Sequence, residues 1–159
     1  MTRVIYAEAG TRKSDWYAVG KVIYNRMNDN RFSGNTAYDI VVANDQFSAY
    51  NSSTDYYNPD TTSAKWTECL NIASSLCNGN APSSSGGITN QVYFRSVKTF
   101  INGYSSPDGT PQFNGDFVEN VVMPDVGDIG AAGLSAYDFS NKYSGYVYLY
   151  NIYFNFSYK

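Results

Sequence analysis

The spacing of apolar residues changes along this chain, and this change constrains the possible folds more than any other feature. In the first half, Val19, Val22, Ile23 and Met27 recur at helical intervals and form one apolar stripe. The last part, residues 143–158, is instead dense in aromatic and β-branched side chains, which are typical of strands. Because helical patterns gather in the first half and strand patterns in the second, the sequence predicts an α+β domain.

Short polar residues mark where the helices of the first half are expected to begin. A short helix is expected over residues 3–9, and Ser14 is a candidate N-cap for the helix that carries the stripe. Thr36 is a candidate cap for a short helix through residue 42, and residues 61–63 offer caps for a further helix. The apolar face of that further helix is expected to consist of Trp66, Leu70, Ala73 and Leu76.

The second half is expected to contain the β-structure. Residues 91–97 alternate weakly and predict a strand, whereas residues 104–115 are rich in Gly, Pro, Ser and Asn and predict a loop. In the aromatic tail, Gly145 and Asn151 are candidate turn positions, so we expect a hairpin there.

Length and charge exclude several classes of protein. A chain of 159 residues suits one domain, so residues 1–159 are expected to form a single unit. With 11 Lys and Arg against 14 Asp and Glu, the chain lacks the basic surface that nucleic-acid binding needs. No apolar run reaches the roughly 20 residues that span a bilayer. No signal peptide is visible at the start of the chain.

The chain contains no histidine, and this absence restricts its chemistry. Histidine is the usual general base of Ser-His-Asp and Cys-His catalysis and the commonest ligand of catalytic zinc. We therefore expect neither a metal site nor a cofactor, and carboxylate chemistry, tyrosine chemistry or plain binding remain. The 16 tyrosines suit stacking against sugar rings, although tyrosine also fills cores and sheet faces.

The two cysteines are expected to be free. Cys69 and Cys77 fall on the same predicted helix. Their separation along its axis is about 12 Å, which is too far for a disulfide. We expect two buried thiols.

Several short segments in the first two thirds of the chain match a known set of motifs. They follow the same order as those motifs and have nearly the same spacing. They are residues 3–10 (RVIYAEAG), 18–27 (AVGKVIYNRM), 31–36 (RFSGNT), 40–42 (IVV), 46–49 (QFSA) and 92–94 (VYF). Together they resemble the SleB-type cell-wall hydrolases, which are spore-cortex-lytic enzymes and their relatives. The resemblance is best over residues 3–96, and residues 97–159 are divergent.

This resemblance implies a lysozyme-like fold with a helical N-terminal half, a small β element and an aromatic-rich β tail. It implies a lytic transglycosylase that cleaves the β-1,4 bond between N-acetylmuramic acid and N-acetylglucosamine. The partner is then the peptidoglycan glycan strand, and the chain is expected to work as a monomer. Its expected place is outside the cell at the wall, or in a phage virion or phage lysis system. The catalytic Glu of the family corresponds to Glu8.

The chemistry of glycoside cleavage also favours Glu8. The reaction needs a carboxylic acid that protonates the leaving oxygen, and an apolar setting keeps such a group protonated. The chain has only three Glu, and the sequence neighbours of Glu8 are apolar. Glu68 is expected to face solvent, and Glu119 lies beyond the resembling segments.

A second carboxylate is not required by this mechanism. The 6-hydroxyl of muramic acid can attack the anomeric carbon, so one Glu serves first as acid and then as base. Asp15, Asp45 and Asp55 are candidate partners, but nothing in their neighbours singles one out, and each is expected at a cap, a turn or the surface.

Other residues are candidates for binding the substrate. Gln46 and Ser48 match a step that lines the cleft opposite the Glu in the family, although they also suit a turn that closes on its own backbone. Tyr93 suits a hydrogen bond to Glu8 or a place beside the developing positive charge, and it also suits a core. Tyr50 is a candidate for stacking against a sugar ring.

The chain departs from the family pattern in two places. The second Glu of the opening motif is absent, and residues 11–13 are Thr, Arg and Lys. The His-containing C-terminal step is also missing, and Asn151 is a candidate for its place. Two alternatives therefore stay open: a hydrolytic N-acetylmuramidase, or a non-catalytic glycan-binding or phage structural module that kept the fold.

Overall fold

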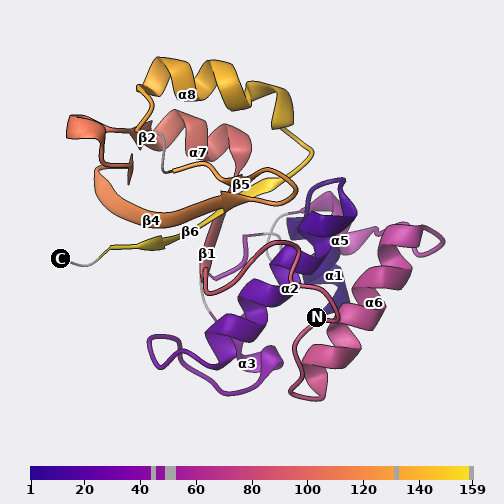
Figure 1. The fold of residues 1–159 in the computed structure, drawn as a ribbon. Coiled ribbons are helices and arrows are strands. Elements are labelled where there is room, and N and C mark those ends of the chain that lie inside the picture. Colours follow the sequence, from indigo (N-terminus) through magenta and orange to yellow (C-terminus); the bar gives the residue numbers. More distant parts are fainter. Residues whose placement is uncertain (44–45, 49–52, 131–132, 158–159) are drawn as a thin grey trace.

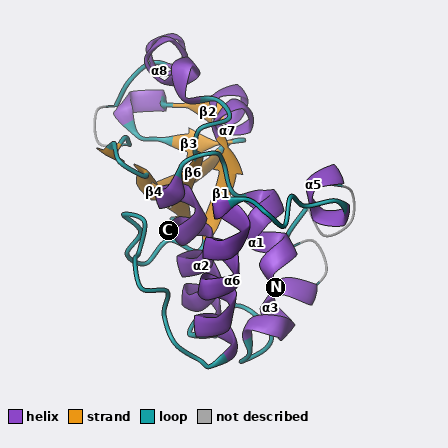
Figure 2. Ribbon diagram, turned by 90° about the vertical axis from the view of Figure 1, so that its right-hand side faces the viewer, coloured by secondary structure: helices purple, strands orange, loops and turns teal. Residues whose placement is uncertain are grey.

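Helices from the first half of the chain pack together, and the second half adds a sheet that is covered by further helices (Figure 1). The computed structural model describes residues 1–43, 46–48, 53–130 and 133–157. We call the part built by α1 to α6 the helical lobe and the part built by the sheet, α7 and α8 the sheet lobe (Figure 2). The α+β class predicted from the sequence is confirmed.

The described helices are α1 (Thr2–Glu8), α2 (Lys13–Met27), α3 (Ala37–Val42), α5 (Thr54–Tyr57), α6 (Ala64–Cys77), α7 (Val97–Gly103) and α8 (Ala136–Tyr143), with 3-10 turns η1 (Pro107–Gly109) and η2 (Ser144–Tyr146). The described strands are β1 (Tyr93–Ser96), β2 (Tyr104–Ser105), β3 (Gln112–Phe113), β4 (Asp116–Met123), β5 (Gly127–Asp128) and β6 (Asn151–Phe156). All pairings are antiparallel, the order is β1-β6-β4-β3-β2, and β5 pairs with β4. Within the described ranges, no helix is long and apolar enough to cross a bilayer.

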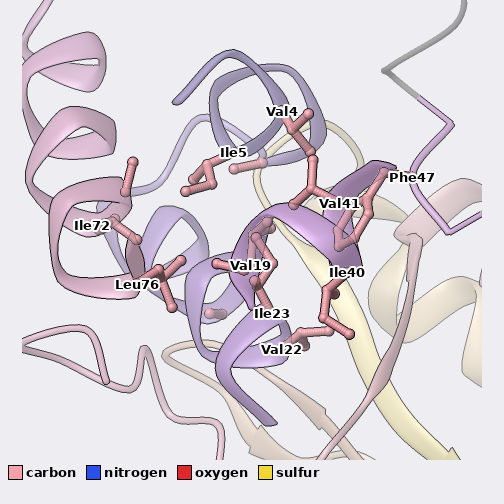
Figure 3. Packing of buried hydrophobic residues seen from close by; sticks show 14 of the residues in the cluster. Val4, Ile5, Val19, Val22, Ile23, Ile40, Val41, Phe47, Ile72 and Leu76 are labelled. Atoms are coloured by element: carbon pink, nitrogen blue, oxygen red, sulfur yellow. The ribbon is translucent and has the colours of Figure 1, made fainter. Parts of the chain in front are cut away.

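The helical lobe is built around one apolar core to which α1, α2, α3 and α6 contribute (Figure 3). Val19, Val22 and Ile23, from the stripe predicted on α2, are fully buried in it. Gly20 allows α2 and α6 to approach closely, because a Cβ at this position would overlap the side chain of Ile72. The helical period of the sequence therefore identified the central helix of this lobe correctly.

Two of the predicted helix caps are confirmed and one is wrong. Thr36 forms a capping box with Asp39 at the start of α3, and Ser63 accepts a hydrogen bond from the Trp66 amide at the start of α6. Ser14, however, lies inside α2, whose N-cap is Arg12. The Arg12 amide donates to the carbonyl of Leu149, so a contact with the far end of the chain sets the start of this helix.

The buried face of α6 differs from the predicted face. It consists of Cys69, Ile72, Ala73 and Leu76, and Leu70 is 46% exposed. Both cysteines are free, as predicted, but Cys77 is exposed while Cys69 is buried. Eight residues correspond to a rotation of about 80° beyond two full turns of an α-helix, which takes Cys77 off the buried face.

Glu68 on α6 also differs from its predicted position in solvent. Its carboxylate accepts hydrogen bonds from Lys13 Nζ at 2.6 Å and from the Tyr17 hydroxyl at 2.7 Å. These two donors lie on α2, so Glu68 joins the two longest described helices.

In the second half, the strand predicted over residues 91–97 is confirmed as β1, but two other predictions are wrong. Residues 104–115 are not only a loop, because β2 and β3 pair there and bury Tyr104 and Phe113 in a second apolar core. The aromatic tail is not a hairpin, because α8 and η2 extend to Tyr146 and only β6 follows. The aromatic side chains of β6 have partners on two sides, since the strand lies between β1 and β4.

The alternation of side chains along β6 joins the two lobes. Ile152 and Phe154 belong to the core beneath α7 and α8, whereas Tyr153 belongs to the core of the helical lobe. Since every second residue of a strand shares a face, Asn151 lies on the same side as Tyr153 and faces the helical lobe. This register places Asn151 beside the end of α1.

Candidate active site

A cavity of about 490 Å³ lies where the end of α1, the segment 46–48, the β1–α7 junction and the start of β6 meet. Its lining residues are Ala7, Glu8, Gln46, Ser48, Phe94, Arg95, Ser96, Thr99 and Asn151. The volume falls within the roughly 300–1,000 Å³ that is typical of ligand sites. Glu8, Gln46 and Ser48, three of the residues predicted from the sequence, are therefore brought together.

Glu8 is the last residue of α1, and its main chain is held by distant side chains. A helix ends with carbonyl groups that have no partner within the helix. Here Asn151 Nδ2 donates to the Glu8 carbonyl at 2.9 Å, and Lys65 Nζ donates to the Ala9 carbonyl at 2.7 Å. Trp16 Nε1 donates to the next carbonyl, that of Gly10, at 3.0 Å. Donors from β6, α6 and α2 thus fix the backbone that carries Glu8.

Behind this helix end, the carboxylate of Asp15 is completely buried. Asp15 accepts four hydrogen bonds, from the Gly10 amide, the Asn151 amide, Asn151 Nδ2 and the Tyr153 hydroxyl. Burial raises the pKa of Asp15, while these hydrogen bonds act in the opposite direction. Asp15 is therefore neither a cap nor a surface residue, and it connects α2 to β6 and to the residues that follow α1.

The Glu8 side chain is half-buried and faces a polar environment. Ser48 Oγ lies 3.4 Å from Glu8 Oε1, and Gln46, Arg95 and Thr99 add polar groups to the same cavity. The apolar setting predicted from the sequence neighbours is therefore wrong in part. Val4 and Ile5 are buried in the core of the helical lobe, and the end of α1 presents Glu8 to the cavity instead. Among the described residues that line the cavity, Glu8 is the only carboxylate.

Arg26 places a buried positive charge behind the cavity. Its Nε donates to the Val92 carbonyl at 2.7 Å and its Nη1 to the Gln46 carbonyl at 3.3 Å. The guanidinium also lies 5.0 Å from the ring centres of Phe32 and Phe47. Burial lowers the pKa of Arg26 to about 10, so the group remains charged at neutral pH. Arg26 thus links α2 to the backbone of Gln46.

Gln46 also lines a second cavity of about 320 Å³, together with Arg31, Phe32, Ser33, Ile40, Ala43 and Tyr93. The predicted site residue Tyr93 is half-buried in this neighbouring cavity rather than in the one that contains Glu8. Its ring stacks against Phe154 and meets Phe156 edge to face. Since both cavities share Gln46, they adjoin each other.

The remaining candidates lie elsewhere. Asp55 is exposed on α5 and does not line the Glu8 cavity. Tyr50, proposed for sugar stacking, and Asp45 lie outside the described residues. Neither residue is assigned to the cavity.

Comparison with known proteins assigns the chain to a family. A protein family described as cell wall hydrolase has a model that matches residues 10–122, which is more than half of the chain. The chain belongs to the cell wall hydrolase family. No curated protein and no solved structure matches it. The family match of this cell wall hydrolase continues beyond residue 96, the limit of the resemblance noted in the sequence. It begins two residues after Glu8, so the role of Glu8 depends on the site geometry rather than on the matched range.

Sequence reasoning missed Arg95, Ser96 and Thr99 of this cell wall hydrolase, which line the cavity at the β1–α7 junction. Ser96 and Thr99 carry a sequence signal, but it is that of a helix N-terminus, because Ser96 Oγ accepts from the Thr99 amide. Asn151 was found only as a candidate for a missing family step, and the structure places it in the cavity.

Proposed function

We propose that this cell wall hydrolase cleaves the β-1,4 bond between N-acetylmuramic acid and N-acetylglucosamine in peptidoglycan as a lytic transglycosylase. Glu8 is the general acid and base. The observation that carries this proposal is the position of Glu8, which is half-buried and is the only carboxylate among the described residues of the 490 Å³ cavity. One carboxylate among the described lining residues suits a mechanism in which the substrate supplies its own nucleophile.

One Glu is sufficient for the whole reaction, and no water molecule is consumed. Protonated Glu8 donates its proton to the glycosidic oxygen, and the bond from that oxygen to C1 of muramic acid breaks. The resulting carboxylate then takes the proton of the muramic acid 6-hydroxyl as O6 bonds to C1, which forms a 1,6-anhydro ring. Glu8 is protonated again at the end.

Ser48 and Gln46 have supporting roles in this proposal. Ser48 Oγ, at 3.4 Å from Glu8 Oε1, orients the carboxylate, and the Gln46 amide side chain binds the sugar between the two adjoining cavities. Tyr93 contributes an aromatic wall of the second cavity for the neighbouring sugar. We further propose that the chain is a single lysozyme-like domain of the SleB type that acts as a monomer at the cell wall.

Product analysis tests this function. Purified peptidoglycan is digested with the protein, and the released fragments are analysed by mass spectrometry. Anhydro-muropeptides are expected. Reducing muramic acid ends would replace the transglycosylase with a hydrolytic muramidase, and binding without any release would favour a non-catalytic module.

Substitution of the proposed acid tests the assignment of Glu8. Glu8→Gln keeps the size of the side chain but cannot donate the proton, so binding without cleavage is expected. The matched control is Glu119→Gln, which makes the same change at an exposed position of β4. Normal turnover by Glu8→Gln would remove Glu8 from the mechanism.

A further inference from the structure

The side-chain amide of Asn151 has its nitrogen fully engaged. One hydrogen of Nδ2 points to Asp15 Oδ2 at 2.9 Å, and the other points to the Glu8 carbonyl, also at 2.9 Å. An amide nitrogen carries only two hydrogens. Both are therefore used by groups of the protein, and the nitrogen has nothing left to offer a ligand.

The amide oxygen of Asn151 is in the opposite situation. Within the described residues, Asn151 Oδ1 accepts no hydrogen bond, while the residue as a whole lines the Glu8 cavity. Among the described residues, Ser106 Oγ is the one side-chain N or O atom that is shielded from solvent and also lacks a hydrogen-bond partner. Asn151 Oδ1 also lacks a partner, so it is not fully shielded from solvent. Asn151 Oδ1 is thus an acceptor that keeps some contact with solvent, on a residue that lines the Glu8 cavity.

The two partners of the amide prevent it from reversing. A rotation of the amide by 180° would direct Oδ1 at the Asp15 carboxylate and at the Glu8 carbonyl, which are both acceptors. Asp15 itself is held by three further donors, the Gly10 amide, the Asn151 amide and the Tyr153 hydroxyl. All of these groups donate to Asp15, so both of its carboxyl oxygens act as acceptors at this site. The Asn151 side chain therefore presents an acceptor, and not a donor, to the cavity.

On the basis of the function proposed above, we propose that Asn151 Oδ1 binds the glycan by accepting a hydrogen bond from a hydroxyl or an acetamido N–H of the sugar beside Glu8. Asp15 is the positioning residue that fixes this polarity. The amide that binds the sugar also donates to the Glu8 carbonyl. One side chain therefore both binds the substrate and positions the catalytic acid.

Binding of inactive protein to purified peptidoglycan sacculi tests this proposal. In a Glu8→Gln background, Asn151→Ala is expected to weaken sedimentation with sacculi by about threefold to tenfold, the size of one neutral hydrogen bond. Lys65→Met in the same background is the control for a loosened end of α1, because it removes the donor to the Ala9 carbonyl and the cation over the Tyr6 ring but leaves Asn151 in place. Its binding should equal that of the parent.

The possible failures are distinguishable. If the Glu8→Gln parent does not bind sacculi, the proposed function fails. If the parent binds and Asn151→Ala binds equally well, the role of Asn151 fails while the function stands. If Asn151→Ala does not fold, NMR of the Glu8→Gln protein decides. The side-chain amide signal of Asn151 should shift when muropeptide oligosaccharide is added, and an unchanged signal would overturn the proposal.

The role of Asp15 is tested in the active enzyme by Asp15→Asn. This change replaces one of the two acceptor oxygens by a donor, so the orientation of the Asn151 amide is fixed less firmly and KM should rise about threefold to tenfold. The control is Tyr153→Phe, which removes one hydrogen bond from the same carboxylate but leaves the two acceptors of Asn151 Nδ2, Asp15 Oδ2 and the Glu8 carbonyl, in place. Tyr153→Phe should lower the stability but leave KM unchanged, and an equal rise of KM in both variants would reduce Asp15 to a structural role.

Discussion

Asn151 Nδ2 donates to the carbonyl of Glu8 at 2.9 Å, although 143 positions separate the two residues along the chain. This hydrogen bond joins the first described helix to the last described strand. The cavity therefore depends on the correct docking of the two lobes, and changes at this junction should affect catalysis as well as stability.

Gly10→Ala tests the junction directly. A methyl group at Gly10 would overlap the backbone carbonyl of Leu149, so the end of α1 and the segment before β6 must separate. Overpacking of this kind costs about 1–3 kcal/mol, and the displacement of Glu8 should lower kcat as well. Denaturant unfolding and turnover on peptidoglycan measure the two effects. Gly145→Ala is the control, because a Cβ there meets no atom within 4 Å.

Arg26→Met tests the buried charge behind Gln46. Methionine fills part of the same space but leaves the Val92 carbonyl without its donor, which should cost about 1–3 kcal/mol. Since the Gln46 carbonyl also loses a partner, activity should fall in protein that is still folded. Arg3→Met, at an exposed arginine on α1, should change the free energy of unfolding by less than about 0.5 kcal/mol. Full activity of folded Arg26→Met would separate Arg26 from the site.

The Lys13–Glu68 pair predicts a dependence of stability on pH. The hydrogen bond from Lys13 lowers the pKa of Glu68 below its ordinary value of 4.5. A group whose pKa is lower in the folded state stabilises the fold above its unfolded pKa, and this contribution is lost as pH falls through the folded pKa. Glu68→Gln should therefore reduce the stability difference between neutral pH and about pH 3. Thermal unfolding at both pH values measures it, and an unchanged difference would contradict the prediction.

The two thiols should differ in reactivity. Burial raises the pKa of Cys69 to about 12, so this thiol should resist alkylation in the folded protein. Cys77 is exposed and should react under native conditions. Mass spectrometry after brief treatment with iodoacetamide should show one modified site, at Cys77, and two sites after denaturation. Modification of Cys69 in native protein would contradict its burial.

Part of the site was predictable because it depends on neighbours in sequence. The short motif around Glu8 and the step with Gln46 and Ser48 are each continuous in sequence, so their residues could be found before the structure was known. Arg95 and Thr99 could not, because they line the cavity only through the way in which β1 leads into α7. Tyr93 was recognised as a candidate, but the turn into β1 assigns it to the neighbouring cavity.

The sequence by itself determined the helical first half, the strand character of β6 and the exclusion of histidine-dependent catalysis. These properties follow from periodicity and composition, which act over a few residues. Only the tertiary structure decided that Asp15 is a buried anchor, and that Asn151 belongs beside Glu8 instead of in a turn. Both outcomes depend on the register of β6 against the helical lobe. A shift by one residue would direct Asn151 and Tyr153 to the opposite face of the sheet. The local sequence does not specify which part of the protein packs against each face.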